Sequence, residues 1–269
     1  MPSIIVAAHN EAAVLAHCVK SIQGDGVEVI VVANGCSDDT AAIGRSLGVQ
    51  VIELAEPSKA KALNAGDDAA TAFPRFYIDA DVELTPGAIS TMVDAMRTTG
   101  ALAAVPSRDL DLDRRPWPVR AYYAIHRRLP ASQNGLYGRG VIAVSKQGRD
   151  RFDRFPEMTA DDLFLDSLFT LDERIVVGSA ASRIRTPTRT ADLINRLSRV
   201  RAGNATMRTT GSHVRRSKPW SWLVDVVLPR PWLAPAGACY AWIVLAAQRR
   251  AARVGDNRWA RDESSRAAA

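Results

Sequence analysis

The first 105 residues alternate short apolar runs with stretches of helical spacing. The apolar runs occupy residues 4–8, 27–33, 49–54, 76–78 and 102–105. This alternation is typical of βαβ units, in which each strand is followed by a helix that packs on the sheet. We therefore expect an α/β fold with a mostly parallel central sheet flanked by helices.

Local signals predict several further elements. Thr85 is expected to cap a helix that begins at Pro86 and ends at Gly100. The later predicted elements are a loop over residues 106–118, a helix near 119–128, a strand at 175–177 and a helix over 190–206. Because 47% of the 269 residues are hydrophobic, the chain has enough apolar surface for a full core and is not expected to be disordered.

Charge is distributed unevenly along the chain. Residues 181–269 hold 17 Lys and Arg against 5 Asp and Glu, a net charge of +12, whereas residues 1–180 have a net charge of −6. Within the basic part, residues 232–247 form an apolar run of 16 residues. A bilayer span needs roughly 20 residues, so this run suits a helix that lies in the membrane interface. A buried helical hairpin explains the same pattern.

The cysteines and the first residues bear on the compartment. Cys18, Cys36 and Cys239 are odd in number and far apart, and their spacing suits neither a disulfide framework nor a zinc site. The first residues lack the basic and then apolar pattern of a secretory signal. We expect a cytoplasmic protein in peripheral contact with the inner face of the membrane. Nucleic acid is not an expected partner, because no nucleic-acid motif accompanies the basic residues.

Two carboxylates follow the apolar run at residues 76–78, in the sequence Asp79-Ala80-Asp81. Alternate residues of a strand share a face, so both carboxylates can converge at the carboxyl end of the strand, where open α/β sheets bind their ligands. A hard divalent cation such as Mg²⁺ or Mn²⁺ relieves their repulsion and recruits substrate phosphates. The sequence therefore predicts a divalent metal site, and a loop that caps a helix is the plainer alternative.

Polar residues also follow the other predicted strands. The sequences AAHNEA and ANGCSDDT come after the first two strands, and SKAKALNAG opens the helix before the Asp79 strand. Because the carboxyl ends of neighbouring parallel strands meet at one edge of a sheet, these residues are expected to line a single crevice.

Together these motifs resemble the family-2 glycosyltransferases over roughly residues 1–205. The matching residues are Asn10-Glu11, Asn34-Gly35 with Ser37-Asp38, Lys59 with Ala62-Leu63-Asn64, Asp79-Ala80-Asp81, and Asp161-Asp162. The resemblance implies a Rossmann-like fold of the glycosyltransferase A type. It also implies a donor that is a nucleotide diphosphate sugar.

The resemblance assigns donor-side roles to single residues. Ala8, Asn10 and Glu11 would border the nucleoside, and Asn34 stands where the family has an aspartate that faces the base. Lys59 would lie near the diphosphate, Asp79 would face the ribose or the ion, and Asp81 would hold the metal.

Asp161 and Asp162 form an acidic pair before an apolar helix. The family pattern implies that this pair lies at the mouth of the acceptor site and that Asp162 is the general base. Helix capping is the alternative, because Thr159 followed three residues later by Asp162 also fits a capping pattern.

A run of arginines lies near residue 200. It resembles the family's arginine-containing helix across the diphosphate, and Arg199 or Arg201 would make that contact. A solvated basic face is the alternative, because helical spacing does not place Arg196, Arg199 and Arg201 on one side. His213 follows this helix as a candidate further metal ligand.

The resemblance implies an inverting hexosyltransferase that moves a sugar from a nucleotide diphosphate sugar to an acceptor hydroxyl. The acceptor itself is unknown and is either free or presented on a lipid. Residues 1–210 would form the catalytic domain, with a nucleotide-sugar half (1–105) and an acceptor half (106–210), and residues 211–269 a basic, partly apolar helical segment. The alternatives are a sugar-phosphate nucleotidyltransferase and a non-catalytic nucleotide-binding protein of the membrane surface.

Overall fold

The computed structural model describes residues 1–24, 26–157, 160–209 and 218–253, with 202–209 described by their backbone. The chain divides into two compact units. The first contains residues 1–109 and 136–184, and the second contains residues 110–135 and those from 185 onward. These compact units do not coincide with the expected catalytic domain of residues 1–210 and C-terminal segment of residues 211–269. That functional division stays a prediction.

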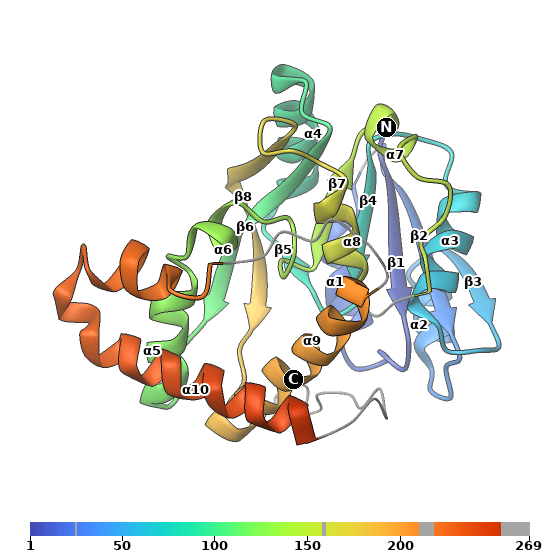
Figure 1. Ribbon diagram of the computed structural model, residues 1–269. Coiled ribbons are helices and arrows are strands. Elements are labelled where there is room, and N and C mark those ends of the chain that lie inside the picture. The colour runs from blue at the N-terminus through green and yellow to red at the C-terminus, as the bar shows by residue number, and fades with distance from the viewer. Residues whose placement is uncertain (25, 158–159, 210–217, 254–269) are drawn as a thin grey trace. The chain divides into compact units, whose positions relative to one another are not determined.

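The strands of the described residues form one eight-stranded sheet in the order β3-β2-β1-β4-β7-β6-β8-β5 (Figure 1). Their bounds are β1 Ser3–Ala8, β2 Glu28–Asn34, β3 Gln50–Leu54, β4 Arg75–Asp79, β5 Glu83–Leu84, β6 Ala103–Asp111, β7 Val141–Val144 and β8 Arg174–Arg185. β1, β2, β3 and β4 pair in parallel, whereas β7 pairs antiparallel with β4 and β6, and β5 pairs antiparallel with β8. The α/β class is confirmed, and the sheet is mixed because its second half is antiparallel.

Helices of the first unit supply a core to each face of the sheet. They are α1 Leu15–Ile22, α2 Thr40–Ser46, α3 Lys59–Ala69, α4 Ala88–Thr99, α7 Lys146–Arg149 and α8 Asp161–Ser167. Ile4 and Val6 of β1 pack in one buried cluster with residues of α1 and α4. Ile5, between them in sequence, belongs to a second cluster with residues of α3 and α8. This alternation along β1 is the period of two that a strand imposes on its side chains.

Two local predictions were wrong. The helix α4 begins at Ala88 after Gly87, whose φ is +74°, and not at Pro86. Thr85 does not cap it, because its Oγ1 accepts a hydrogen bond from the backbone N–H of Ala181, 3.0 Å away. The loop expected over residues 106–118 is also too long, since β6 continues to Asp111 and the next helix begins at Trp117. In both places a tertiary partner overrides the local pattern.

The second unit is helical. Its helices are α5 Trp117–His126, α6 Pro130–Asn134, α9 Thr190–Thr209 and α10 Ala234–Arg253, with a π-helical segment at Trp222–Val227 and a 3₁₀ turn at Pro231–Leu233. Tyr122 of α5 stacks on Tyr240 of α10 with ring centroids 5.2 Å apart. Among the helices described, none is both long and apolar enough to cross a membrane. The helix expected in the basic C-terminal part of the chain is present as α10. It packs against α5 and α9.

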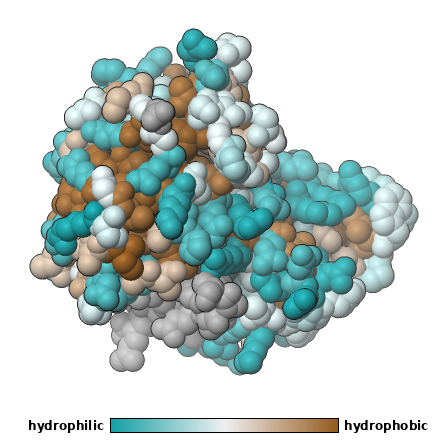
Figure 2. Space-filling model, turned by 180° about the vertical axis from the view of Figure 1, so that it is seen from behind, coloured by the Kyte–Doolittle hydropathy of each residue, from teal (hydrophilic) through white to brown (hydrophobic). Residues whose placement is uncertain are grey.

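Hydrophobic residues reach the surface among hydrophilic ones in several places on the face opposite to the view of Figure 1 (Figure 2). Apolar atoms contribute a large share of the surface of any folded protein. A functional surface therefore has to be identified from a cluster of residues with a shared chemistry, and not from single exposed apolar side chains.

Candidate functional site

The carboxyl ends of β1, β2 and β4 lie side by side. In the sheet register Ala8 pairs with Ala33, one residue before Asn34, and Ala7 pairs with Asp79. Ala8, Asn34 and Asp79 therefore lie at one edge of the sheet, as the order of motifs predicted. This edge of a parallel sheet is where ligands bind in open α/β folds.

The loop after β1 is fastened to the loop after β2. The Oδ1 atom of Asn10 accepts a hydrogen bond from the backbone N–H of Ser37 at 2.6 Å, and the N–H of Glu11 donates to Oγ1 of Thr40 at 2.7 Å. Asn10 has a φ of +53°, a left-handed conformation that asparagine tolerates better than most residues. Both loops therefore form one polar rim at the end of the sheet.

Asp38 completes this rim. Its carboxylate accepts hydrogen bonds from the N–H groups of Ala12 and Thr40, each at 3.1 Å. Burial alone would raise the pKa of Asp38, but these donors and the Thr40 hydroxyl outweigh it and lower the pKa below its usual value. Asp38 thus stays ionised and holds the loop in place.

Asn34 is buried beneath this rim. Its Nδ2 donates to the carbonyl oxygen of Ala8 at 2.8 Å, and its Oδ1 accepts from the N–H of Ser58 at 3.1 Å. The side chain therefore joins the ends of β1 and β2 to the start of α3. This backbone-holding position was not expected from the sequence, and the contact of Asn34 with a base stays a prediction.

Lys59 lies between two carboxylates. Its Nζ is 2.7 Å from Oδ1 of Asp79, the last residue of β4, and 2.9 Å from Oδ1 of Asp161, the first residue of α8. Ser58 caps α3 by accepting the N–H of Lys61, which places Lys59 in the first turn of the helix. Three residues from separate motifs thus meet, although they lie 20 to 102 positions apart in the sequence.

The ion pairs change how Lys59 titrates. Burial alone would lower the pKa of Lys59, but the carboxylates of Asp161 and Asp79 outweigh it and raise the pKa well above its usual value. The side chain of Lys59 nevertheless remains 34% exposed. Lys59 is therefore a permanent cation that stays accessible to a ligand.

The acidic pair at the start of α8 has unusual acidities. Burial raises the pKa of Asp161 to about 6. The negative charges of Asp162 and Asp79 act in the same direction, and the positive charge of Lys59 opposes them. Burial also raises the pKa of Asp162. Carboxyls with raised pKa values in a cleft are candidates for proton transfer near neutral pH.

Asp162 is oriented by two backbone donors. Its Oδ2 accepts from the N–H of Gly138 at 2.9 Å, and its Oδ1 accepts from the N–H of Leu163 at 2.8 Å. The second bond comes from the next residue and is not the contact of the capping alternative, and α8 begins after Ala160 without a side-chain cap. The first bond comes from a different segment. Thr159, the other half of that capping pattern, lies outside the described residues.

The Gly138 segment is a part of the site that the sequence reading missed. The carbonyl of Gly140 accepts the N–H of Asp79 at 2.9 Å, so residues 138–140 contact both Asp79 and Asp162. Gly140 has a φ of +65°, and an added Cβ would lie 2.3 Å from Cγ2 of Val82 and 3.3 Å from Oδ2 of Asp79. The two glycines around Arg139 were the signal, because positive φ and close approach favour glycine.

Asp81 lies in the turn after β4 and is exposed. The described residues contain no group of three or more His, Cys, Asp or Glu side chains arranged to hold a metal ion. Asp79 and Asp81 alone still fit Mg²⁺ or Mn²⁺, because such ions use one or two carboxylates with water and substrate phosphates.

The arginine candidates belong to the second unit. Arg201 in α9 donates from Nη1 to the carbonyl oxygen of Val244 in α10 at 2.8 Å, and Arg199 lies in the same helix. Their predicted contact with a diphosphate stays a prediction. His213 lies outside the described residues.

Known proteins support the class of fold and activity. The family model for glycosyl transferase family 2 matches residues 3–145, more than half of the chain. No curated protein sequence matches the chain at a significant level. The chain therefore belongs to glycosyltransferase family 2.

Solved structures with the same fold include three glycosyltransferases. The mannosyltransferase PcManGT from Pyrobaculum calidifontis, in complex with GDP-Man and Mn²⁺, is 20% identical with a TM-score of 0.63, over 95% of this chain and 76% of that one. Glucosyl-3-phosphoglycerate synthase from Mycobacterium tuberculosis, with Mn²⁺, UDP-Glc and phosphoglyceric acid, is 21% identical with a TM-score of 0.54, over 78% and 79%. TarS from S. aureus, with UDP-GlcNAc, is 14% identical with a TM-score of 0.55, over 94% and 91%. At these identities the likeness establishes the glycosyltransferase A-type fold.

Proposed function

We propose that this protein is an inverting, metal-dependent glycosyltransferase that moves a hexose from a nucleotide diphosphate sugar to an acceptor hydroxyl. The observation that carries this proposal is the meeting of Lys59 with Asp79 and Asp161, which brings a cation and the acidic pair of α8 to the ligand-binding edge of the sheet. A cation beside a diphosphate site and a base beside an acceptor site are what such a transfer requires.

Asp162 is the proposed general base. As the acceptor oxygen attacks the anomeric carbon, a new carbon–oxygen bond forms, the bond to the diphosphate breaks, and the hydroxyl proton passes to Asp162. The raised pKa of Asp162 supports this role, because a base works best when its pKa lies near the operating pH. A single displacement inverts the configuration at the anomeric carbon.

The donor side has to stabilise the departing nucleoside diphosphate. Lys59 supplies a permanent positive charge, and Asp79 and Asp81 would hold Mg²⁺ or Mn²⁺. When bound, the ion neutralises charge on the diphosphate oxygens. PcManGT and the glucosyl-3-phosphoglycerate synthase both contain Mn²⁺ and a nucleotide sugar, which supports metal use here.

The other donor contacts extend this assignment. Asn10 and Glu11 lie on the rim formed by the first two loops, and Ala8 ends β1 with its side chain buried. These three residues are proposed to border the nucleoside. Asn34 would then act from beneath the rim, through its hold on the backbone. Arg199 or Arg201 is proposed to contact the diphosphate, and His213 to add a metal ligand.

The second unit supports contact with a membrane surface and hence an acceptor presented on lipid. Exposed apolar residues gather between residues 218 and 253, with Trp232 73% exposed. They are Trp220, Val224, Leu228, Trp232, Trp242 and Leu245. The same stretch contains five basic residues and one acidic residue, Asp225. Tryptophan and basic side chains are typical of segments at anionic lipid interfaces. We propose that the protein is cytoplasmic and contacts the inner face of the membrane.

Vesicle sedimentation tests the membrane contact. The protein is expected to pellet with vesicles that contain anionic lipid more than with neutral vesicles. Trp232→Ser combined with Trp242→Ser is expected to weaken this binding. Equal binding by the double variant would contradict a role for these side chains.

The alternatives predict different chemistry. A sugar-phosphate nucleotidyltransferase would form a nucleotide sugar from a nucleoside triphosphate, and its phosphate-binding glycine-rich loop is not found after β1, where the sequence is AAHNEA. A non-catalytic nucleotide-binding protein would bind nucleotide without turnover.

The direct test measures release of nucleoside diphosphate from UDP-Glc, UDP-GlcNAc and GDP-Man, with Mn²⁺ or EDTA. One donor is expected to be cleaved in a metal-dependent manner, and Asp162→Asn should lower the rate about 10²–10⁴-fold. Bound but uncleaved nucleotide sugar, with or without Asp162, would favour the non-catalytic alternative.

A further inference from the structure

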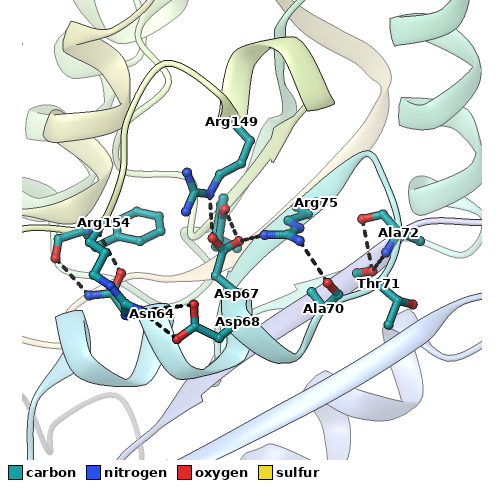
Figure 3. A network of polar contacts seen from close by, with 12 residues as sticks. Asn64, Asp67, Asp68, Ala70, Thr71, Ala72, Arg75, Arg149 and Arg154 are labelled. Carbon is teal, nitrogen blue, oxygen red and sulfur yellow. Dashed lines mark hydrogen bonds and ion pairs between the residues drawn. The ribbon is translucent and has the colours of Figure 1, made fainter.

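Asn64 of α3 binds the backbone of a segment far along the chain. Its Nδ2 donates to the carbonyl oxygen of Phe155 at 3.0 Å, and its Oδ1 accepts the N–H of the same residue at 2.8 Å. One side-chain amide therefore satisfies both backbone groups of Phe155, as a neighbouring strand would. Figure 3 shows Asn64 beside the other polar residues of α3.

The ring of Phe155 lies between the two elements that carry the carboxylates of the site. Its centroid is 4.9 Å from that of Tyr77 and 6.1 Å from that of Phe164. Tyr77 precedes Asp79 by two residues in β4, and Phe164 follows Asp162 by two residues in α8. The placement of Phe155 is thus linked by direct packing to both sides of the site.

A buried carboxylate on the next turn of α3 fastens the start of the same segment. Asp67 pairs with Nε of Arg149 and with Nη1 of Arg75, each at 2.5 Å, and accepts the hydroxyl of Tyr77 at 2.8 Å (Figure 3). The side chain of Asp67 is only 2% exposed. Residues 149–155 are therefore attached to α3 at two points, one at the buried Asp67 and one at the half-buried Asn64.

We propose that Asn64 is a positioning residue, which fixes the acidic pair Asp161-Asp162 relative to Lys59 by holding the backbone of Phe155. The proposal rests on the proposed function, in which Lys59 serves the donor and Asp162 the acceptor. Lys59 and Asn64 share one helix, and five residues of helix span about 7.5 Å. Only five residues lie between Phe155 and Asp161 in the sequence, so the attachment of Phe155 to α3 limits how far Asp161 can move from Lys59.

The need for such an attachment follows from the ion pair itself. The bond between Lys59 and Asp161 is partly exposed, and a bound diphosphate would compete with Asp161 for the ammonium group. The hydrogen bonds of Asn64 involve no group that contacts substrate, so they persist during turnover. Asn64 thus keeps α8 in place when the ion pair is lost.

Two variants and a matched control test this role. Asn64→Ala removes both hydrogen bonds, and Asn64→Asp keeps an acceptor for the N–H of Phe155 but opposes its carbonyl with a carboxylate. Asp68→Ala is the control, because Asp68 lies on the same helix and pairs with Arg154 of the same segment, but both side chains are exposed. Circular dichroism checks that each variant is folded.

The measurements are the dissociation constant of the nucleoside diphosphate with Mn²⁺ and the turnover number for donor cleavage. In both Asn64 variants turnover is expected to fall about 10-fold to 100-fold while nucleotide affinity stays within about twofold, because a misplaced base slows the chemistry without removing donor contacts. Asp68→Ala is expected to stay within about twofold in both.

Wild-type turnover in folded Asn64→Ala would overturn the proposal. Equal losses of nucleotide affinity and turnover, or unfolding of both Asn64 variants, would also overturn it, because they indicate a general structural role. Failure of the proposed function gives a different result, since the wild-type protein would then cleave no donor at all.

Discussion

The two ends of α3 hold carboxylates and cations in opposite ways. At the start of the helix, Lys59 lies between Asp79 and Asp161, and its side chain remains 34% exposed. At the end, Asp67 is 2% exposed and is enclosed by two arginines and a tyrosine hydroxyl. Similar side chains therefore form two different clusters. The open cluster, around Lys59, is partly exposed to solvent, and the closed cluster, around Asp67, is buried and paired.

The difference follows from solvent access and from the number of donors. Asp67 receives Arg75, Arg149 and Tyr77, so its oxygens are occupied and its charge is compensated within the protein. Removing one partner of such a buried ion pair is costly, because it leaves uncompensated charge inside the protein. The side chain of Lys59 is partly exposed, so the proposed diphosphate could replace one of its carboxylate partners.

The largest effect is expected for the closed cluster. Asp67→Ala leaves two guanidinium groups and a hydroxyl without their shared acceptor, and it should lower the free energy of unfolding by about 3–5 kcal/mol. Urea denaturation at neutral pH measures this change. A loss below about 1 kcal/mol, as for a surface pair, would show that the cluster is not closed.

The next effect sharpens the contrast at the open cluster. Lys59→Gln should change the free energy of unfolding by about 1 kcal/mol or less, because the ion pairs are partly exposed. It should lower donor cleavage about 100-fold or more, because the charge proposed to stabilise the leaving group is lost. If Lys59→Gln lowered the free energy of unfolding as much as Asp67→Ala, the contrast between the open and the closed cluster would be wrong.

A smaller effect is expected from pH. The pKa of Asp161 is raised to about 6, and that of its neighbour Asp162 is raised as well. Protonation of Asp162 removes the proposed base, so turnover should fall by up to about tenfold per unit once the pH decreases below the raised pKa of this carboxyl. Rates between pH 5 and 8 at saturating donor measure this limb. A rate independent of pH down to pH 5 would contradict the assignment of the base to this pair.

The smallest effect serves as the reference for the comparison. Asp68→Asn removes an ion pair with Arg154 in which both side chains are more than half exposed. The free energy of unfolding should change by less than about 0.5 kcal/mol. Urea denaturation in parallel with Asp67→Ala gives a matched pair on adjacent residues, and a similar loss in both would contradict burial as the cause.

The strands of the sheet were predictable because their apolar runs are contiguous. β1, β2, β3 and β4 lie within one or two residues of the expected runs. The continuation of β6 to Asp111 was not predictable, because Arg108 and Asp109 carry charges in a strand whose support comes from distant segments. Local sequence carries no information on such support.

The candidate site also contains features that the sequence predicts and features that it does not. The strand-end motifs correctly gathered Ala8, Asn34 and Asp79, since parallel strands place their ends at one edge. The pairing of Lys59 with Asp161 and the attachment of Asn64 to Phe155 join residues 102 and 91 positions apart. Contacts of that kind depend on the packing of α8 and α3, and no local periodicity encodes them.

The most direct test of the central claim is calorimetric titration of the purified protein with UDP, GDP and dTDP, each with Mn²⁺ and with EDTA, alongside Asp81→Ala. We expect one nucleotide to bind with Mn²⁺, and we expect this binding to be lost with EDTA and in the variant. Absence of binding by every nucleotide to the folded protein would contradict a nucleotide-sugar site at this edge of the sheet.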